Sequence, residues 1–199
     1  PDGFVVPAAA YLAAMDEART ADAAAVARLI REANLPRECV PTEHLNDPKV
    51  WEALLESMPL MAMVRNLGKM TEVGLLAPLS QAARTVCERL GDARKLRQSR
   101  LHPLAILMAL STYRTGHGLK GKLHWAPVGQ GVDALDDAFL KAFDAIEPAG
   151  KRTLIGLDVS GSMSVGNVAG SRLTYCAGAD TDQKAASNVA LARLGIIVR

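Results

Sequence analysis

A short apolar run near the end of the chain, residues 154–159, constrains the fold more than any other stretch. Its apolar residues are Leu154, Ile155, Leu157 and Val159. A nearly continuous run of this kind is typical of a strand buried on both faces. Asp158, Ser160 and Ser162 follow in a D-x-S-x-S pattern, and alternate residues of an extended chain point to the same side. We therefore expect three oxygen ligands at the carboxyl end of a buried strand.

These three side chains predict a magnesium site. Mg²⁺ prefers hard oxygen ligands in octahedral geometry, and open α/β sheets bind ligands at the carboxyl ends of their strands. The pattern resembles the metal-ion-dependent adhesion site of von Willebrand factor A domains, which implies that Asp158, Ser160 and Ser162 hold the ion. The alternative is a strand followed by a Ser/Gly turn that binds nothing.

The rest of the chain has the spacing of helices rather than strands. The predicted helices span residues 8–19, 21–33, 49–58, 60–70, 80–90, 103–112 and 132–146. The helix 103–112 is apolar on nearly every side, so we expect it to be buried. Successive helical pairs suggest a HEAT-like array, and residues 148–151 mark a boundary where helices give way to a strand. The fold class is therefore mainly α over 1–150, with the start of an α/β domain over 151–199, where 183–198 forms a helix.

Composition excludes several classes of protein. Hydrophobic residues make up 49% of the chain, enough for a sizeable core, but no run approaches the roughly 20 residues of a membrane span. The three cysteines are scattered without C-x-x-C spacing, which argues against a disulfide framework or zinc and fits a reducing cytoplasm. The ends at Pro1 and Arg199 carry no start or stop signal, so we expect a fragment of a longer protein.

Basic residues gather in three places, although the net charge is only +2. Arg65 and Lys69, four residues apart, share one helix face, and residues 84–100 carry six Lys or Arg. The third cluster is a loop that contains Arg114, His117, Lys120 and Lys122, with Trp125 as a surface on which bases can stack. Arg65, Lys69 and the loop are our candidate RNA contacts. The alternatives are a solvated helix face and an ordinary connection between helices.

The loop also satisfies a nucleotide-binding pattern, which we reject. Residues 116–122, G-H-G-L-K-G-K, match G-x-G-x-x-G and nearly match the Walker A pattern. Both patterns work only between a strand and the start of a helix, whose N-terminus receives the phosphate. Here a helix precedes the loop, Pro127 follows it closely, and Leu123 stands where a Ser or Thr would bind Mg²⁺.

Five segments together resemble the Ro autoantigen family of TROVE-domain RNA-binding proteins. They are V-W-E-A-L-L-x-x-M-P-L (50–60), R-N-L-G-K-M (65–70), T-G-H-G-L-K-G-K-L (115–123), A-L-D-D-A-F (134–139) and E-P-A-G-K-R…D-V-S-G-S-M (147–163). They keep the family's order and spacing from about residue 34 to residue 163. The Ala-rich composition suggests a bacterial orthologue.

The resemblance implies a ring of HEAT-like repeats closed by a von Willebrand factor A domain. Family members bind small structured Y RNAs on the outside of the ring and single-stranded ends of misfolded RNAs in its central hole. Bacterial relatives work with exoribonucleases in RNA quality control and stress recovery. Two features depart from the family: the earlier helical repeats are missing, and so are the later loops that complete the metal site.

We therefore expect a non-enzymatic, cytoplasmic RNA-binding protein of Ro type that does not bind DNA. The alternative is a protein-interaction scaffold that binds a partner's carboxylate through the metal, without RNA. A hydrolase is disfavoured because the sequence contains no G-x-S-x-G, H-E-x-x-H or paired catalytic carboxylates. Retention of RNA that disappears as salt rises would separate the first two hypotheses.

Overall fold

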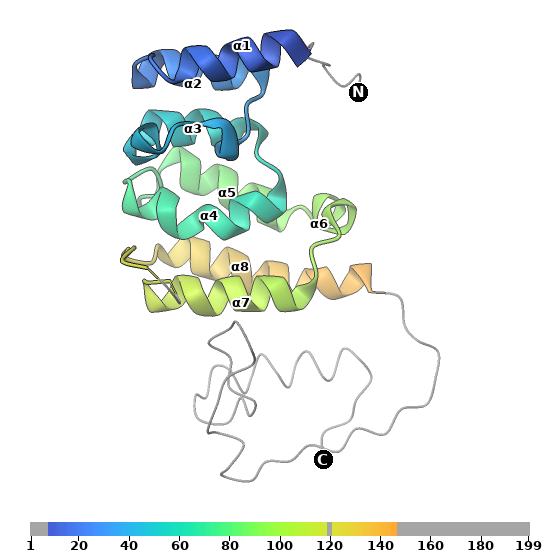
Figure 1. Ribbon diagram of the computed structural model, residues 1–199. Helices are drawn as coiled ribbons and strands as arrows, with labels where there is room; N and C mark the ends of the chain where they lie inside the picture. Colours follow the sequence, from blue (N-terminus) through green and yellow to red (C-terminus); the bar gives the residue numbers. More distant parts are fainter. Residues whose placement is uncertain (1–7, 119–120, 147–199) are drawn as a thin grey trace, which may run out of the picture.

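The chain forms a stack of helices, seen edge-on in Figure 1. The computed structural model describes residues 8–118 and 121–146. The helices are α1 (Ala8–Ala18), α2 (Ala23–Ala33), α3 (Pro48–Ser57), α4 (Leu60–Glu72), α5 (Gln81–Gly91), α6 (Ala93–Ser99), α7 (Pro103–Thr115) and α8 (Gly129–Ala142), with 3₁₀ turns η1 (Arg37–Cys39), η2 (Thr42–Asn46) and η3 (Phe143–Ala145). The prediction of a mainly α fold is confirmed. The predicted strand, the A-domain helix and the boundary at residue 150 lie outside the described residues.

Caps in the sequence set several helix boundaries. Asp22, expected in the first turn of its helix, is instead the N-cap of α2, where its carboxylate accepts the Ala25 N–H at 2.8 Å. Pro48 occupies the start of α3, where a missing N–H costs nothing, as predicted. Pro59 separates α3 from α4 and cannot continue a helix, also as predicted.

The layers are held together by one continuous core. α2 packs on α3, α4 packs on α7, and α8 lies against both α5 and α7. Trp51 of α3 is fully buried, and its indole N–H donates to the Leu45 carbonyl at 2.8 Å. The face of α8 predicted to be apolar is the buried one, with Leu135 and Phe139 almost inaccessible to solvent. The helix begins at Gly129, earlier than predicted.

Arg89 of α5 joins two layers by binding the end of α3. Its guanidinium donates to the Leu55 carbonyl at 2.7 Å and to the Met58 carbonyl. These carbonyls lie at a helix C-terminus, where backbone acceptors have no intrahelical partner. Burial lowers the pKa of Arg89, because the charged form loses water. One member of the predicted basic run is therefore a structural residue.

The basic run 84–100 also contains a helix that the sequence patterns did not reveal. Gly91, predicted as the C-cap of its helix, is instead the last residue of α5. Asp92 follows with φ of −79° and caps the new helix α6 by accepting the N–H groups of Arg94 and Lys95. The break was missed because an aspartate serves equally well on an exposed helix face and as an N-cap.

The helix 103–112 was predicted to be buried on nearly every side, and this is wrong. α7 buries Ile106, Leu110 and Tyr113, whereas Leu104 on another side is 45% exposed. It also continues to Thr115, beyond the predicted end. Within residues 8–118 and 121–146, none of the helices has the length and apolarity needed to cross a membrane.

Candidate nucleic-acid interface

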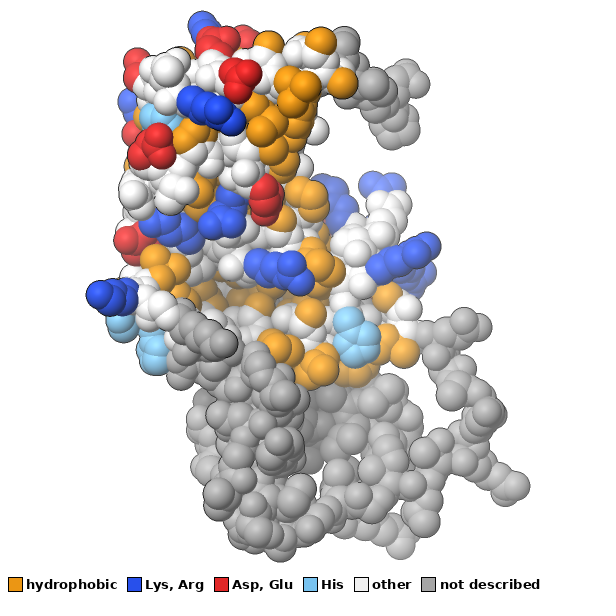
Figure 2. Space-filling model, viewed as in Figure 1, with side chains coloured by type: hydrophobic (Ala, Val, Ile, Leu, Met, Phe, Trp, Pro, Cys, Tyr) orange, Lys and Arg blue, Asp and Glu red, His pale blue; other side chains and the backbone are white. Residues whose placement is uncertain are grey.

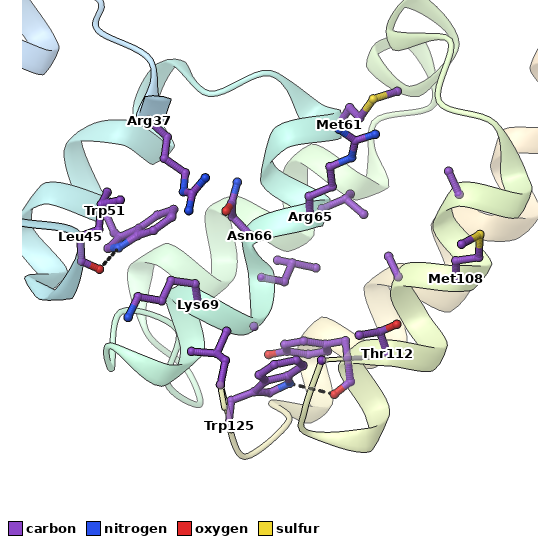
Figure 3. Close-up of a pocket in the computed structure, with 18 of the residues that line it drawn as sticks. Arg37, Leu45, Trp51, Met61, Arg65, Asn66, Lys69, Met108, Thr112 and Trp125 are labelled. Atoms are coloured by element: carbon purple, nitrogen blue, oxygen red, sulfur yellow. Dashed lines mark hydrogen bonds between the residues drawn. The ribbon is translucent and has the colours of Figure 1, made fainter. Parts of the chain in front are cut away.

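A groove of about 690 Å³ lies between α4 and α7, with η1 and η2 at one end and the segment around Trp125 at the other (Figure 3). α4 buries Met63, Leu67 and Met70 in the core. Because residues on a helix face recur every three to four positions, its next face presents Arg65, and beside it Lys69, to the groove. The prediction that these two cations share a face outside the core is therefore confirmed.

The walls of the groove carry positive charge only. Arg37, Arg65 and Lys69 line it, and no Asp or Glu does among the described residues. Lys69 is fixed in place: its ammonium donates to Asn46 Oδ1 at 2.8 Å and pairs with Glu72 at 2.6 Å. Arg65 is exposed and makes no ion pair with any described residue. In Figure 2 the Lys and Arg side chains form a band across this face, above an apolar strip.

Arg37 is a groove residue that the sequence did not single out. It comes from η1, and its guanidinium carbon lies 5.9 Å from the centre of the Trp51 ring, within the range of a cation–π contact. Its Nε is buried without a hydrogen-bond partner among the described residues. No sequence pattern signals this position, because its placement depends on the buried Trp51 fourteen positions further along the chain.

Trp125 closes the other end of the groove and is held by the protein itself. Its indole N–H donates to the Tyr113 carbonyl at 2.9 Å, and the two rings stack with centroids 6.1 Å apart. Gly68 of α4 leaves the space that the indole fills, since a Cβ there would lie 2.7 Å from the ring. Trp125 was expected to offer a surface to bases, but it is half-buried and already stacked. Its first role is to fasten the loop to α4.

The predicted basic loop lies next to the groove. Gly116 caps α7 with φ of +72°, a conformation that favours glycine, and His117 pairs with His124 in an antiparallel bridge. Arg114 and Lys122 are exposed on this side of the molecule but do not line the groove. The structure thus brings Arg65 and Lys69 into the groove and leaves Arg114, His117 and Lys122 at its margin. Lys120 lies outside the described residues.

The predicted metal ligands Asp158, Ser160 and Ser162 also lie outside the described part of the chain. Within residues 8–118 and 121–146, no group of three or more His, Cys, Asp or Glu side chains is arranged to hold a metal ion. The magnesium site therefore stays a prediction.

Comparison with known proteins assigns the family. The TROVE domain family matches residues 21–113, which include α2 to α7 up to Tyr113. RNA-binding protein RO60 of Deinococcus radiodurans is 46% identical over 155 residues, covering 77% of this chain and 29% of that protein. This chain belongs to the Ro family of TROVE-domain proteins. The resemblance found in the sequence is confirmed.

Two further Ro proteins agree. RNA-binding protein RO60 of Caenorhabditis elegans is 46% identical over 136 residues, covering 68% of this chain and 21% of that protein. The crystal structure of the Deinococcus radiodurans Ro protein superposes with a TM-score of 0.80 at 39% identity, covering 96% of this chain and 38% of that one. The chain thus spans less than a third of the length of the curated Ro relatives that it matches.

Proposed function

We propose that this Ro-family chain binds RNA, and that the groove between α4 and α7 receives a single strand. The observation that carries the proposal is the charge of the groove: three cations line it without an acid among the described residues, and Arg37 and Arg65 are not neutralised by any described carboxylate. A phosphate backbone supplies the missing negative charge along its length. The names of both curated relatives, which call them RNA-binding proteins, support the same conclusion.

Other surfaces extend the proposal to structured RNA. Arg84, Arg94, Arg97 and Arg100 are exposed along α5 and α6. Exposed arginines without aromatic neighbours suit contacts to a phosphate backbone, which carry no sequence information. We assign this surface to a small Y-like RNA and the groove to single-stranded ends of misfolded RNA. The protein's role is to bind these RNAs in quality control and stress recovery, not to catalyse a reaction.

The remaining features follow from the family resemblance and belong to the same proposal. The partner protein is an exoribonuclease, and the compartment is the cytoplasm. Asp158, Ser160 and Ser162 hold Mg²⁺ in an adhesion-type site. These residues favour the ion through their chemistry, because a carboxylate and two hydroxyls are hard oxygen ligands. The alternative, a scaffold that binds only a protein partner through this metal, predicts no affinity for RNA.

Salt dependence of RNA binding tests the proposal. We expect the full chain to bind a single-stranded RNA with an affinity that falls steeply as salt rises. The double variant Lys120→Ala/Lys122→Ala and the single variant Arg65→Ala each leave fewer phosphates neutralised, so each lowers the salt slope by roughly 0.7 for every phosphate that no longer has a cation beside it. Arg19→Ala is the matched control, because Arg19 is exposed and remote from the groove.

Two results decide the outcome. If the wild-type chain binds no RNA at low salt, the proposal is wrong and the scaffold hypothesis takes its place. If RNA binds but Arg65→Ala and the double variant keep the wild-type affinity and slope, RNA binding stands and the groove is not its site. Circular dichroism of each variant shows whether the helices are intact.

A further inference from the structure

The two long walls of the groove differ in chemistry. The wall formed by η1 and α4 carries Arg37 and Arg65, whereas the wall formed by α7 is uncharged where it faces the groove. Figure 3 shows Arg37 and Arg65 on the side of η1 and α4, with Met108 and Thr112 across from them on α7. A strand that entered with its phosphates toward α7 would leave both its charges and the two arginines without partners.

Arg37 is the better placed of the two arginines for an anion. A guanidinium has five N–H donors, and Arg37 donates none of them to another described residue. Its position is nevertheless fixed, because it lies over the ring of Trp51, which is itself fully buried. A fixed arginine with unused donors loses little conformational entropy when it binds a phosphate.

The α7 wall suits bases instead. Ala105 and Ala109 leave room beside the helix, and Met108 between them is half-buried with an adaptable apolar side chain. A thioether packs well against an aromatic ring, and a nucleobase has an extended π face. The uncharged wall therefore has the surface that an unstacked base can cover.

We propose that the groove fixes the orientation of a bound single strand, with the phosphates along Arg37 and Arg65 and the bases turned toward Met108 and Ala109 of α7. This inference rests on the proposed function, since it requires that RNA enters the groove. It adds that Arg37 is a positioning contact for the backbone, and that Met108 contacts bases.

A cycle between variants and probes tests the orientation. The probes are a short single-stranded RNA and the same strand with its bases removed, both measured by fluorescence anisotropy with the full chain. Arg37→Ala should weaken both probes by the same factor, about tenfold or more, because both keep their phosphates. Met108→Ala should weaken the base-bearing strand by about threefold to tenfold and leave the abasic strand unchanged. Arg19→Ala should change neither.

The orientation is overturned if Met108→Ala weakens both probes equally, or if Arg37→Ala affects only the base-bearing strand. It is also overturned if neither variant changes either probe while the wild-type chain still binds RNA, and in that case the proposed function survives. Failure of the wild-type chain to bind the base-bearing strand removes both proposals. Arg37→Lys keeps the charge but not the planar donor set, so it should recover only part of the affinity if the fold is intact.

Discussion

Replacing Gly68 by alanine should destabilise the protein, although alanine is the better helix former. Gly68 lies inside α4, where alanine would normally stabilise by about 1 kcal/mol. Here the new Cβ would lie 2.7, 2.8 and 2.9 Å from three carbon atoms of the Trp125 ring. Carbon atoms that are not bonded do not approach this closely, so the indole must move.

The indole cannot move without breaking other interactions. Its N–H bond to the Tyr113 carbonyl and its stacking on the Tyr113 ring both depend on the present position, and the Trp125 backbone N–H donates to the Gly116 carbonyl at 2.8 Å. Overpacking costs about 1–3 kcal/mol, and a broken hydrogen bond adds about 1 kcal/mol. After subtracting the helix-propensity gain of about 1 kcal/mol, we expect the free energy of unfolding to fall by a net amount of about 1–3 kcal/mol.

Thermal unfolding followed by circular dichroism measures this change, which corresponds to a fall in Tm of roughly 3–10 °C. Tryptophan fluorescence should change as well, because Trp125 is one of only two tryptophans and the other, Trp51, is fully buried. Gly91→Ala is the matched control: it also lies in a helix, but nothing surrounds its Cβ position within 4 Å, so it should stabilise by about 0.5–1 kcal/mol.

A double variant identifies the cause. With Trp125→Leu in place the ring is gone, so adding Gly68→Ala should cost little or stabilise the chain. Gly68→Ala that matches or exceeds the wild type in stability would refute the reasoning. So would an unchanged cost in the Trp125→Leu background, because the clash would then lie elsewhere.

Three further changes give separate expectations. Arg89→Lys should lower the free energy of unfolding by about 1.5–3 kcal/mol, because an ammonium cannot reach both carbonyls as a planar fork; urea denaturation beside Arg84→Lys, an exposed arginine of the same helix, checks this. The pKa of Asp92 lies below its ordinary value, chiefly because the Lys95 N–H donates to its carboxylate, so this cap contributes stability above the unfolded-state pKa and loses it as pH falls through the folded-state pKa. An NMR titration should show that depressed pKa, and Asp92→Asn should remove the pH dependence of α6. In a protein with a complete A domain, Asp158→Ala should abolish the heat of Mg²⁺ binding in calorimetry.

Helices with local signals could be predicted from the sequence. Pro48 and Pro59 mark boundaries because a proline ring fixes φ and lacks an N–H, and this holds in any tertiary context. The apolar stripe of α4 placed Arg65 and Lys69 correctly for the same reason, since a helix presents fixed faces. Composition alone did not reveal which side of α7 is buried. Its residues are apolar all round, so only the packing of α4 and α8 against it decides.

The functional part of the site depends on contacts between distant residues, which explains what the sequence did not reveal. Trp125 was correctly singled out as an unusual aromatic residue, but its partners Gly68 and Tyr113 come from two helices that meet only in the folded chain. Arg37 was overlooked because an isolated arginine beside a proline carries no pattern.

The same reasoning explains why Arg37 acquires a role that the basic run lacks. In the run, charge is abundant, yet Arg89 is used by backbone carbonyls and Lys95 lies 3.7 Å from Asp92. Arg37 stands alone in the sequence, but the fold sets it against Trp51 in a groove without described acids. Unpaired charge in a partly enclosed site interacts more strongly with a phosphate than exposed charge does, because solvent screens it less. The density of basic residues along a sequence is therefore a poorer guide to an RNA contact than the number of donors that the folded protein leaves unused.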